Sequence, residues 1–275
     1  MRNSQTKELV LTALFTAIIV IMVFTNLGYI PLIVINATIV HIPVILGTLF
    51  CGPKKGAFLG FVFGLTSFLN ATFRGTSLSS FVFSPVLAAN IVGASGIWKS
   101  TWIAFVPRIM VGIIPFFVYV LVHKAVTAEK KEIWTAILNA AIAVFLLIGV
   151  RAFLIKMVEG ISPIVALIVA VVIAAAVFAL LLWVTKNKNA NILAFSYAGV
   201  AGALTNTILV MGSIYVLYKD AYANALSVDA SAVLGVILGV VSFNGVVEAI
   251  VAAVLVAALG SVLIMIQPVW GSKDK

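Results

Sequence analysis

Long apolar runs dominate the chain, and short polar or charged loops separate them. A helix needs about 20 mostly apolar residues to cross a bilayer. The apolar residues are continuous rather than alternating with polar ones, which is typical of helices and not of barrel strands. The pattern predicts eight spans, at residues 8–27, 38–52, 56–73, 101–122, 131–156, 161–184, 193–218 and 229–266.

Two segments depart from simple spanning helices. The run 38–52 is short and contains Pro43, so we expect it to be kinked or to begin unwound. Segment 75–100 combines loop residues with an interrupted apolar stretch that includes Ser84-Pro85. We expect this segment to form a long outer loop, re-entrant in part and buried in protein where it enters the membrane.

The last apolar run, 229–266, is too long for one simple crossing. Asn244-Gly245 is the obvious break, because glycine and polar side chains mark the sites where apolar helices kink. The pattern therefore predicts an outer piece at 229–241 and a spanning piece at 245–266.

The composition supports an all-α polytopic membrane protein. Hydrophobic residues make up 64% of the chain and charged residues only 9%, and the mean hydropathy is +1.26. Cys51 is the single cysteine, which excludes an internal disulfide and a cysteine-based metal cluster. His41 and His123 are isolated, and no catalytic triad or carboxylate pair is present. We expect no enzymatic activity, no cofactor and no metal site.

The net charge of +9 lies mostly in short loops, which is the positive-inside pattern of membrane proteins rather than a nucleic-acid surface. Both termini are therefore predicted to be cytoplasmic. This orientation places on the cytoplasmic side Arg2, Lys7, Lys54, Lys55, Lys124, Lys130, Lys131, Lys186, Lys188, Lys273 and Lys275.

Polar residues at one level of the membrane suggest a ligand site. An ionisable group near the bilayer centre costs roughly 2.5–3.5 kcal/mol, so such groups usually face a cavity, one another or a ligand. In the predicted topology these residues share the outer half of the bilayer. The candidate substrate-binding residues are Asn70, Arg74, Asn90, Arg108, Thr205, Asn206, Asn244 and Glu248.

Arg108 and Glu248 allow two interpretations. They form a structural ion pair with one another, or at least one of them contacts the ligand. The guanidinium fork of arginine suits a carboxylate or phosphate, so Arg108 favours an anionic ligand. The ridge Gly56-x3-Gly60-x3-Gly64 predicts close packing of its helix against a neighbour.

Several motifs occur together in the order found in one transporter family. The chain resembles the substrate-binding S component of energy-coupling factor (ECF) vitamin transporters over about residues 1–127 and 192–266. The motifs are Thr12-Ala13-Leu14-Phe15-Thr16-Ala17, Ile42-Pro43-Val44-Ile45-Leu46-Gly47, Gly52-Pro53-Lys54-Lys55-Gly56, Pro107-Arg108-x3-Gly112, Leu204-Thr205-Asn206-Thr207 and Asn244-Gly245-x2-Glu248.

The resemblance implies a core of six helices with the vitamin bound near the outer surface. Residues 1–127 would hold core spans one to four with the outer loop 75–100, and residues 192–275 would hold core spans seven and eight. Residues 128–191 would be an inserted helical pair of unknown function, which preserves the topology downstream.

The resemblance also implies partners: a transmembrane T component and two cytoplasmic ATPases in a bacterial plasma membrane. Ala13 and Ala17 would contact the T component, and the loaded site would topple to the cytoplasmic side. The chain itself is not expected to hydrolyse ATP. Its closest approach to a phosphate-binding loop, at 47–54, has Pro53 where lysine is needed.

Pantothenate is the vitamin that the resemblance favours, and folate or riboflavin comes next. One competing interpretation is a self-sufficient, ion-coupled secondary transporter, in which Glu248 would be the coupling acid. Another is a purely structural membrane subunit. Tight ligand binding by the isolated chain would exclude the structural subunit, and ATP-independent uptake would favour the secondary transporter.

Overall fold

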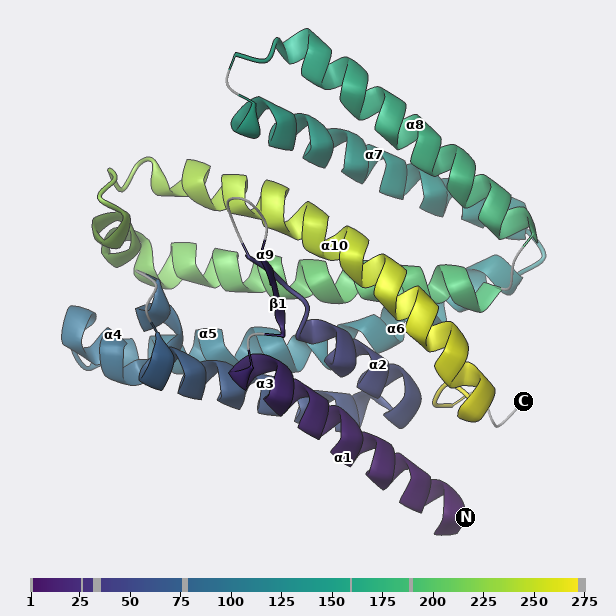
Figure 1. The fold of residues 1–275 in the computed structure, drawn as a ribbon, viewed down its shortest axis with the longest axis horizontal. Helices are drawn as coiled ribbons and strands as arrows, with labels where there is room; N and C mark the ends of the chain where they lie inside the picture. Colours follow the sequence, from purple (N-terminus) through teal and green to yellow (C-terminus); the bar gives the residue numbers. More distant parts are fainter. Residues whose placement is uncertain are drawn as a thin grey trace.

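The computed structural model describes residues 2–25, 27–31, 36–75, 79–158, 160–187 and 190–271, and it is almost entirely helical (Figure 1). Six segments in this described part are long and apolar enough to cross a membrane, and α5 and α6 together make one of them. The helices are α1 (Arg2–Phe24), α2 (His41–Cys51), α3 (Pro53–Arg74), α4 (Pro85–Val92), α5 (Ser95–Val111), α6 (Ile114–Thr127), α7 (Lys131–Met157), α8 (Pro163–Asn187), α9 (Ala190–Leu226) and α10 (Val233–Ile266).

The first and third helices begin at the same end of the molecule. Lys55 at the start of α3 pairs with Glu8 near the start of α1, with 2.6 Å between nitrogen and oxygen. The chain between them must therefore cross back. It does so through an antiparallel hairpin, β1 (Tyr29–Pro31) and β2 (Asn36–Thr38), followed by α2.

Helix α2 is shorter than the span predicted at 38–52. It has 11 residues, which corresponds to about 16 Å and is too short to cross a bilayer alone. Pro43 lies in its first turn, where a missing N–H breaks no helical hydrogen bond. Thr38, the first residue of the predicted span, is the last residue of β2, and α2 begins only at His41.

Helices α3 and α5 approach closely along the glycine ridge. A Cβ atom at Gly60 or Gly64 would collide with backbone carbonyls of α5, and one at Gly56 with the carbonyl of Gly112, which directly follows α5. The prediction that this ridge packs against a neighbouring helix is confirmed. The contact fixes the position of the α5 backbone that carries Arg108.

The expectation of a long outer loop at 75–100 is wrong for much of that segment. A short 3₁₀-helix, η1 (Ser80–Phe83), precedes α4, and α5 already begins at Ser95. The Ser84 hydroxyl accepts a hydrogen bond from the Leu87 N–H, and proline follows in the first turn. Ser84-Pro85 is therefore a helix start, and Gly93 with φ 71° ends that helix.

The predicted break in the last span is also wrong. Helix α10 is continuous from Val233 to Ile266. Gly245 faces the Thr207 side chain on α9, where an added Cβ would make an ordinary contact at 3.5 Å, and the helix continues through it. The irregularity lies instead at Tyr218 in α9, where φ is −133° and ψ is 18°.

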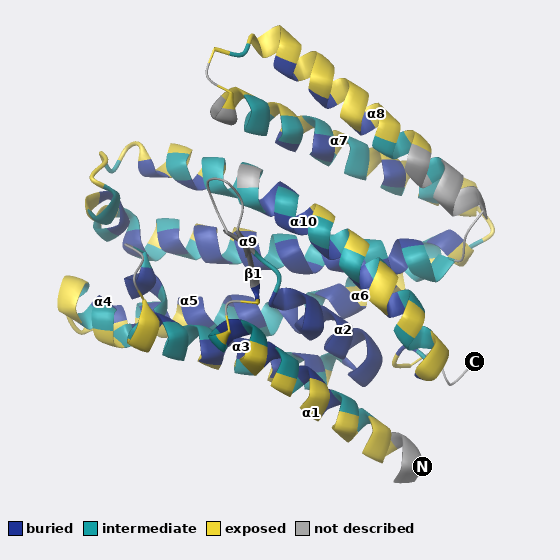
Figure 2. Ribbon diagram, in the orientation of Figure 1, coloured by how far each residue is buried: buried dark blue, intermediate teal, exposed yellow. Residues whose placement is uncertain are grey.

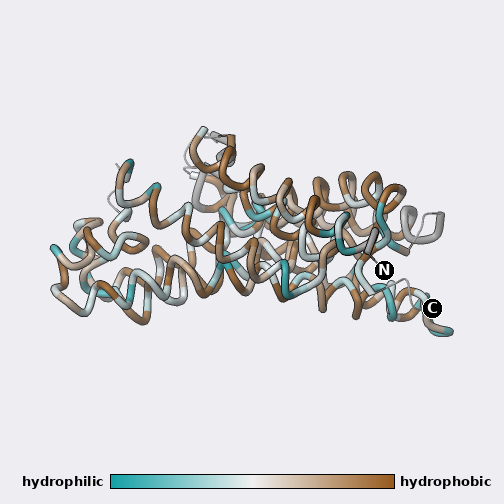
Figure 3. The backbone as a smooth tube through the Cα atoms, turned by 90° about the horizontal axis from the view of Figure 1, so that it is seen from below, coloured by the Kyte–Doolittle hydropathy of each residue, from teal (hydrophilic) through white to brown (hydrophobic). Residues whose placement is uncertain are grey.

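Helices α9 and α10 pack against each other in the middle of the fold. The hairpin of α7 and α8 lies on one side of them, and α1, α3 and α5 lie on the other (Figure 1). Buried positions concentrate on α2 and on the inner faces of α9 and α10, whereas α8 is largely exposed (Figure 2). Hydrophilic positions gather toward the two ends, with a few inside otherwise apolar helices (Figure 3).

Both ends of the chain lie at the same end of the bundle (Figure 1). The Trp270 N–H, near the C-terminus, donates a hydrogen bond of 2.9 Å to the carbonyl of Leu49, near the end of α2. Residues 272–275 lie outside the described part.

Candidate functional site

Glu248 lies inside the protein and joins three segments. Its side chain is 5% exposed. Oε1 accepts a hydrogen bond of 2.9 Å from the Thr38 N–H of β2, and Oε2 accepts one of 2.9 Å from the Thr207 hydroxyl of α9. These donors stabilise a carboxylate that an apolar interior would otherwise disfavour.

Arg108 is buried on α5 with its guanidinium directed toward the start of that helix. Its side chain is 6% exposed, and Nη1 donates a hydrogen bond of 2.7 Å to the carbonyl of Ile103. The guanidinium carbon lies 5.5 Å from the ring centre of Phe63 and 4.7 Å from that of Phe83. Cation–π contacts of this kind hold an arginine where water is scarce.

The ion pair considered between Arg108 and Glu248 does not form among the described residues. The two groups interact electrostatically at longer range, and each has the other partners given above. Both charges are thus held in place independently. An anionic ligand group near Arg108 would therefore not have to displace Glu248.

Two asparagines lie on the facing sides of α9 and α10. Asn206 is 9% exposed, and its Oδ1 has no hydrogen-bond partner in the described structure. The Oδ1 of Asn244 is likewise buried without a partner, one helical turn before Glu248. Thr205, beside Asn206, is half-buried.

The remaining candidate residues lie apart from this group. Asn70 is half-buried on α3, and Asn90 is exposed on α4. Arg74 is exposed and donates a hydrogen bond of 2.8 Å to the carbonyl of Phe24, whose ring it also contacts. In this structure Arg74 holds the end of α1 against α3.

Three further buried or bonded residues were not among the predicted binding residues: Thr38, Thr207 and His41. Thr38 contributes only its backbone N–H, which no side-chain pattern reveals. Thr207 had a usable signal, because it follows Asn206 in the same polar turn. His41 is fully buried at the start of α2, and neither of its ring nitrogens has a hydrogen-bond partner in the described structure.

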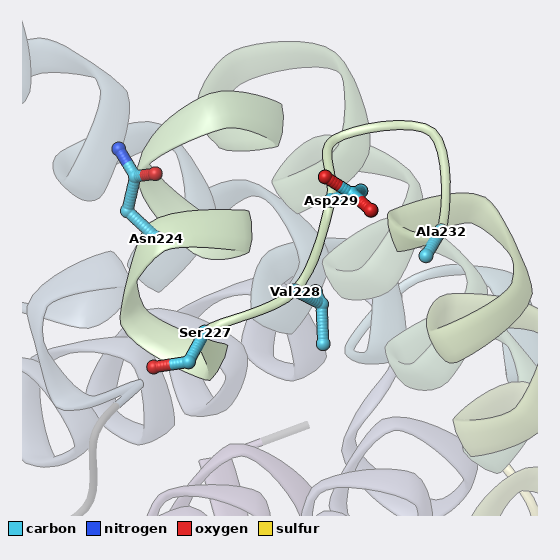
Figure 4. A pocket seen from close by; sticks show the side chains of 5 residues that line it. All are labelled: Asn224, Ser227, Val228, Asp229 and Ala232. Atoms are coloured by element: carbon cyan, nitrogen blue, oxygen red, sulfur yellow. The ribbon is translucent and has the colours of Figure 1, made fainter.

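An open depression of about 650 Å³ lies elsewhere, at the turn between α9 and α10. Figure 4 shows the five side chains around it, all from this one connection: Asn224, Ser227, Val228, Asp229 and Ala232. At a rise of 1.5 Å per residue, the start of α10 lies roughly 17 Å along the helix from Asn244. The depression is therefore separate from the buried polar residues.

A buried arginine, a buried carboxylate and two amide oxygens without partners in the described structure are suited to hold a small polar molecule. The family model described as "ECF transporter, substrate-specific component" matches residues 7–181, more than half of the chain. The chain belongs to this family. It is accordingly a multi-pass membrane protein and a transporter subunit, not an enzyme, as the sequence predicts.

Two named relatives are similar to this S component over most of its length. The pantothenic acid transporter PanT of Lactococcus lactis subsp. cremoris is 32% identical over 202 residues, which cover 99% of that protein and 69% of this chain. The pantothenate transporter PanT of Leuconostoc mesenteroides subsp. mesenteroides is 26% identical over 279 residues. That alignment covers all of the relative and 99% of this chain.

The second alignment includes the helical pair at 128–191. Because it covers nearly all of both chains, the Leuconostoc protein has residues aligned with this pair. The Lactococcus protein is matched almost completely by about two thirds of this S component. The family model also extends through α7 and most of α8.

Proposed function

We propose that this S component binds pantothenate and delivers it to the other subunits of an ECF importer. The observation that carries the proposal is the buried Arg108, which matches the carboxylate of an anionic vitamin. The names of both relatives support the same vitamin. Folate and riboflavin are the alternatives that a competition assay separates.

The proposed binding residues are Arg108, Thr205, Asn206, Asn244 and Glu248. Arg108 would bind the ligand carboxylate, and the asparagine amides would bind its neutral polar groups. Glu248 would hold β2 against α10 beside the ligand. Asn70, Arg74 and Asn90 would act at the periphery of the site, on the outer side.

The proposed topology has eight crossings with both termini in the cytoplasm of a bacterial plasma membrane. The segment from β1 through α2 makes the second crossing, and α5 with α6 makes the fourth. Residues 1–127 and 192–275 form the six-span core, and 128–191 form an inserted pair.

The proposed partners are a membrane T component and two cytoplasmic ATPases. Ala13 and Ala17 are both exposed on α1, and small side chains permit close approach of a partner helix. The α7–α8 hairpin lies on the opposite side of the bundle from α1 (Figure 1). The inserted pair therefore leaves this docking face open.

The proposal is tested with the purified chain in detergent and in liposomes. Calorimetry should show one pantothenate bound per chain, with folate and riboflavin unable to compete. Liposomes that contain only this chain should accumulate no pantothenate. Adding the T component and the ATPases with internal ATP should start uptake.

Two outcomes would contradict the proposal. Failure of pantothenate to bind, together with tight binding of folate or riboflavin, would assign the chain another vitamin. Concentrative uptake by the chain alone, driven by a sodium or proton gradient, would favour a secondary transporter.

A further inference from the structure

His41 is a buried imidazole that the site as proposed above does not use. It begins α2 directly after the hairpin, is 0% exposed, and has no hydrogen-bond partner at either nitrogen in the described structure. Buried polar side chains are bonded in the great majority of cases, and each exception needs an explanation. A binding site for a ligand is such an explanation.

The packing of α2 on α9 shows what lies opposite His41. Phe50 stacks on Phe195 with ring centres 6.0 Å apart, and the Ile45 side chain fills the space beside Gly202. Residue numbers rise along α2 as they fall along α9, so the two helices are antiparallel. One further turn toward the start of α2 brings His41 to the level of Asn206.

The packing of α9 on α10 extends this level to a third helix. Gly199 packs against Ala252, and Gly245 against Thr207, so these helices are also antiparallel. Asn244 therefore lies near the level of Asn206. The Thr38–Glu248 hydrogen bond brings the chain just before His41 to the same part of α10. Three helices thus contribute unpartnered polar atoms to one level.

We propose that His41, together with Asn206 and Asn244, binds the uncharged hydrogen-bonding groups of the ligand. This inference rests on the proposed vitamin-binding function. An amide oxygen only accepts hydrogen bonds, so each of the two unpartnered Oδ1 atoms requires a donor on the ligand. A neutral imidazole adds one donor and one acceptor.

This chemistry specifies a ligand class. A carboxylate supplies no donor, so an anion without hydroxyl or amide groups leaves both asparagine oxygens unbonded. Pantothenate carries two hydroxyls and an amide N–H in addition to its carboxylate. Arg108 would then bind the carboxylate, and His41 and Asn206 would bind the hydroxyls, which leaves the amide to Asn244.

The test compares two ligands against three substitutions. The ligands are pantothenate and N-(3,3-dimethylbutanoyl)-β-alanine, which keeps the carboxylate and amide and lacks both hydroxyls. His41→Phe removes the hydrogen-bonding atoms and keeps an aromatic ring, and His41→Gln restores a donor and an acceptor. His123→Phe is the control, because His123 stacks on Tyr119 in α6, away from Asn206.

In the unaltered protein, loss of the hydroxyls should weaken binding about tenfold or more, the effect of one or two buried hydrogen bonds. His41→Phe should weaken binding of pantothenate by a similar factor. It should change binding of the analogue without hydroxyls by less than about threefold. His41→Gln should recover part of the loss. His123→Phe should change neither affinity. If His41→Phe does not fold, Asn206→Leu replaces it with the same expectation.

Equal weakening of both ligands by these substitutions would show that His41 and Asn206 only support the fold, and would overturn the inference. Unchanged pantothenate affinity in the folded His41→Phe protein would also overturn it, while leaving the proposed function intact. Failure of the unaltered protein to bind pantothenate would instead overturn the proposed function and this inference with it.

Discussion

The Thr207 hydroxyl on α9 donates a 2.9 Å hydrogen bond to the Glu248 carboxylate on α10. The other carboxylate oxygen accepts the Thr38 N–H of β2. A single side chain thus connects the two central helices with the hairpin that precedes α2. The carboxylate is buried, so its hydrogen bonds are made in an environment where an unbonded polar group is costly.

Replacing Glu248 should destabilise the protein in a graded manner. Glu248→Ala leaves two buried donors without an acceptor, which should cost about 2–5 kcal/mol of unfolding free energy in total. Glu248→Gln keeps one acceptor oxygen and should cost less. Thermal unfolding in detergent measures the difference, with Glu129→Ala in an exposed loop as the control. Equal melting temperatures for Glu248→Ala and the unaltered protein would contradict the structural role.

Arg108 should contribute strongly to ligand affinity. Charge-assisted hydrogen bonds contribute about 1.5–3 kcal/mol, so Arg108→Ala should weaken pantothenate binding roughly 10- to 150-fold. Arg108→Lys keeps the charge but loses the planar fork, so its pantothenate affinity should lie between those of Arg108→Ala and the unaltered protein. Calorimetry on folded protein measures both. Arg151→Ala, at an exposed position on α7, is the matched control. Unchanged affinity in Arg108→Ala would remove Arg108 from the site.

The glycine ridge on α3 should tolerate no added methyl group at its centre. A Cβ at Gly60 would collide with the backbone carbonyl of Arg108, which cannot move without shifting α5. Gly60→Ala should therefore destabilise the protein by about 1–3 kcal/mol, the usual cost of overpacking, and should weaken ligand binding through Arg108.

Gly212→Ala on α9 is the control for this prediction, because nothing lies within 4 Å of the Cβ it would add. Alanine favours a helix over glycine by about 0.5–1 kcal/mol, so this variant should be slightly more stable. A stable Gly60→Ala protein with normal affinity would mean that α5 can adjust without moving the Arg108 side chain.

The sequence predicted much of the fold because lipid imposes a strong pattern. The predicted span 131–156 and the helix α7 nearly coincide. The failures have local causes. Gly245 suggests a break in the sequence, yet it lies inside the continuous helix α10 and faces Thr207. The residues of segment 75–100 are typical of a loop, yet Ser84-Pro85 starts a helix.

The buried polar positions of the candidate site were predictable where a polar side chain interrupts an apolar run. Arg108, Asn206, Asn244 and Glu248 stand out for this reason, and all four have buried polar atoms in the structure. His41 did not stand out, because a single histidine at the start of a helix has no informative spacing. Its significance depends on the register of α2 against α9, which only the three-dimensional packing reveals.

The exposed small residues on α1 should be required for transport but not for binding. Ala13 and Ala17 lie one turn apart on a face that no other part of the described chain covers. Replacing both with Trp would hold a partner helix away by the width of an indole ring. Pantothenate affinity should stay within about threefold of the unaltered protein, since neither residue lies near Arg108 or Glu248.

ATP-dependent uptake in liposomes with the full transporter should be abolished in the Ala13→Trp, Ala17→Trp variant. The control is Ala136→Trp, Ala140→Trp, which has the same spacing on an exposed face of α7, on the opposite side of the bundle. That control should retain both binding and uptake. Loss of binding in the α1 variant would mean that these alanines serve packing within the S component. Loss of uptake in the α7 variant alone would place the partner on the inserted pair instead.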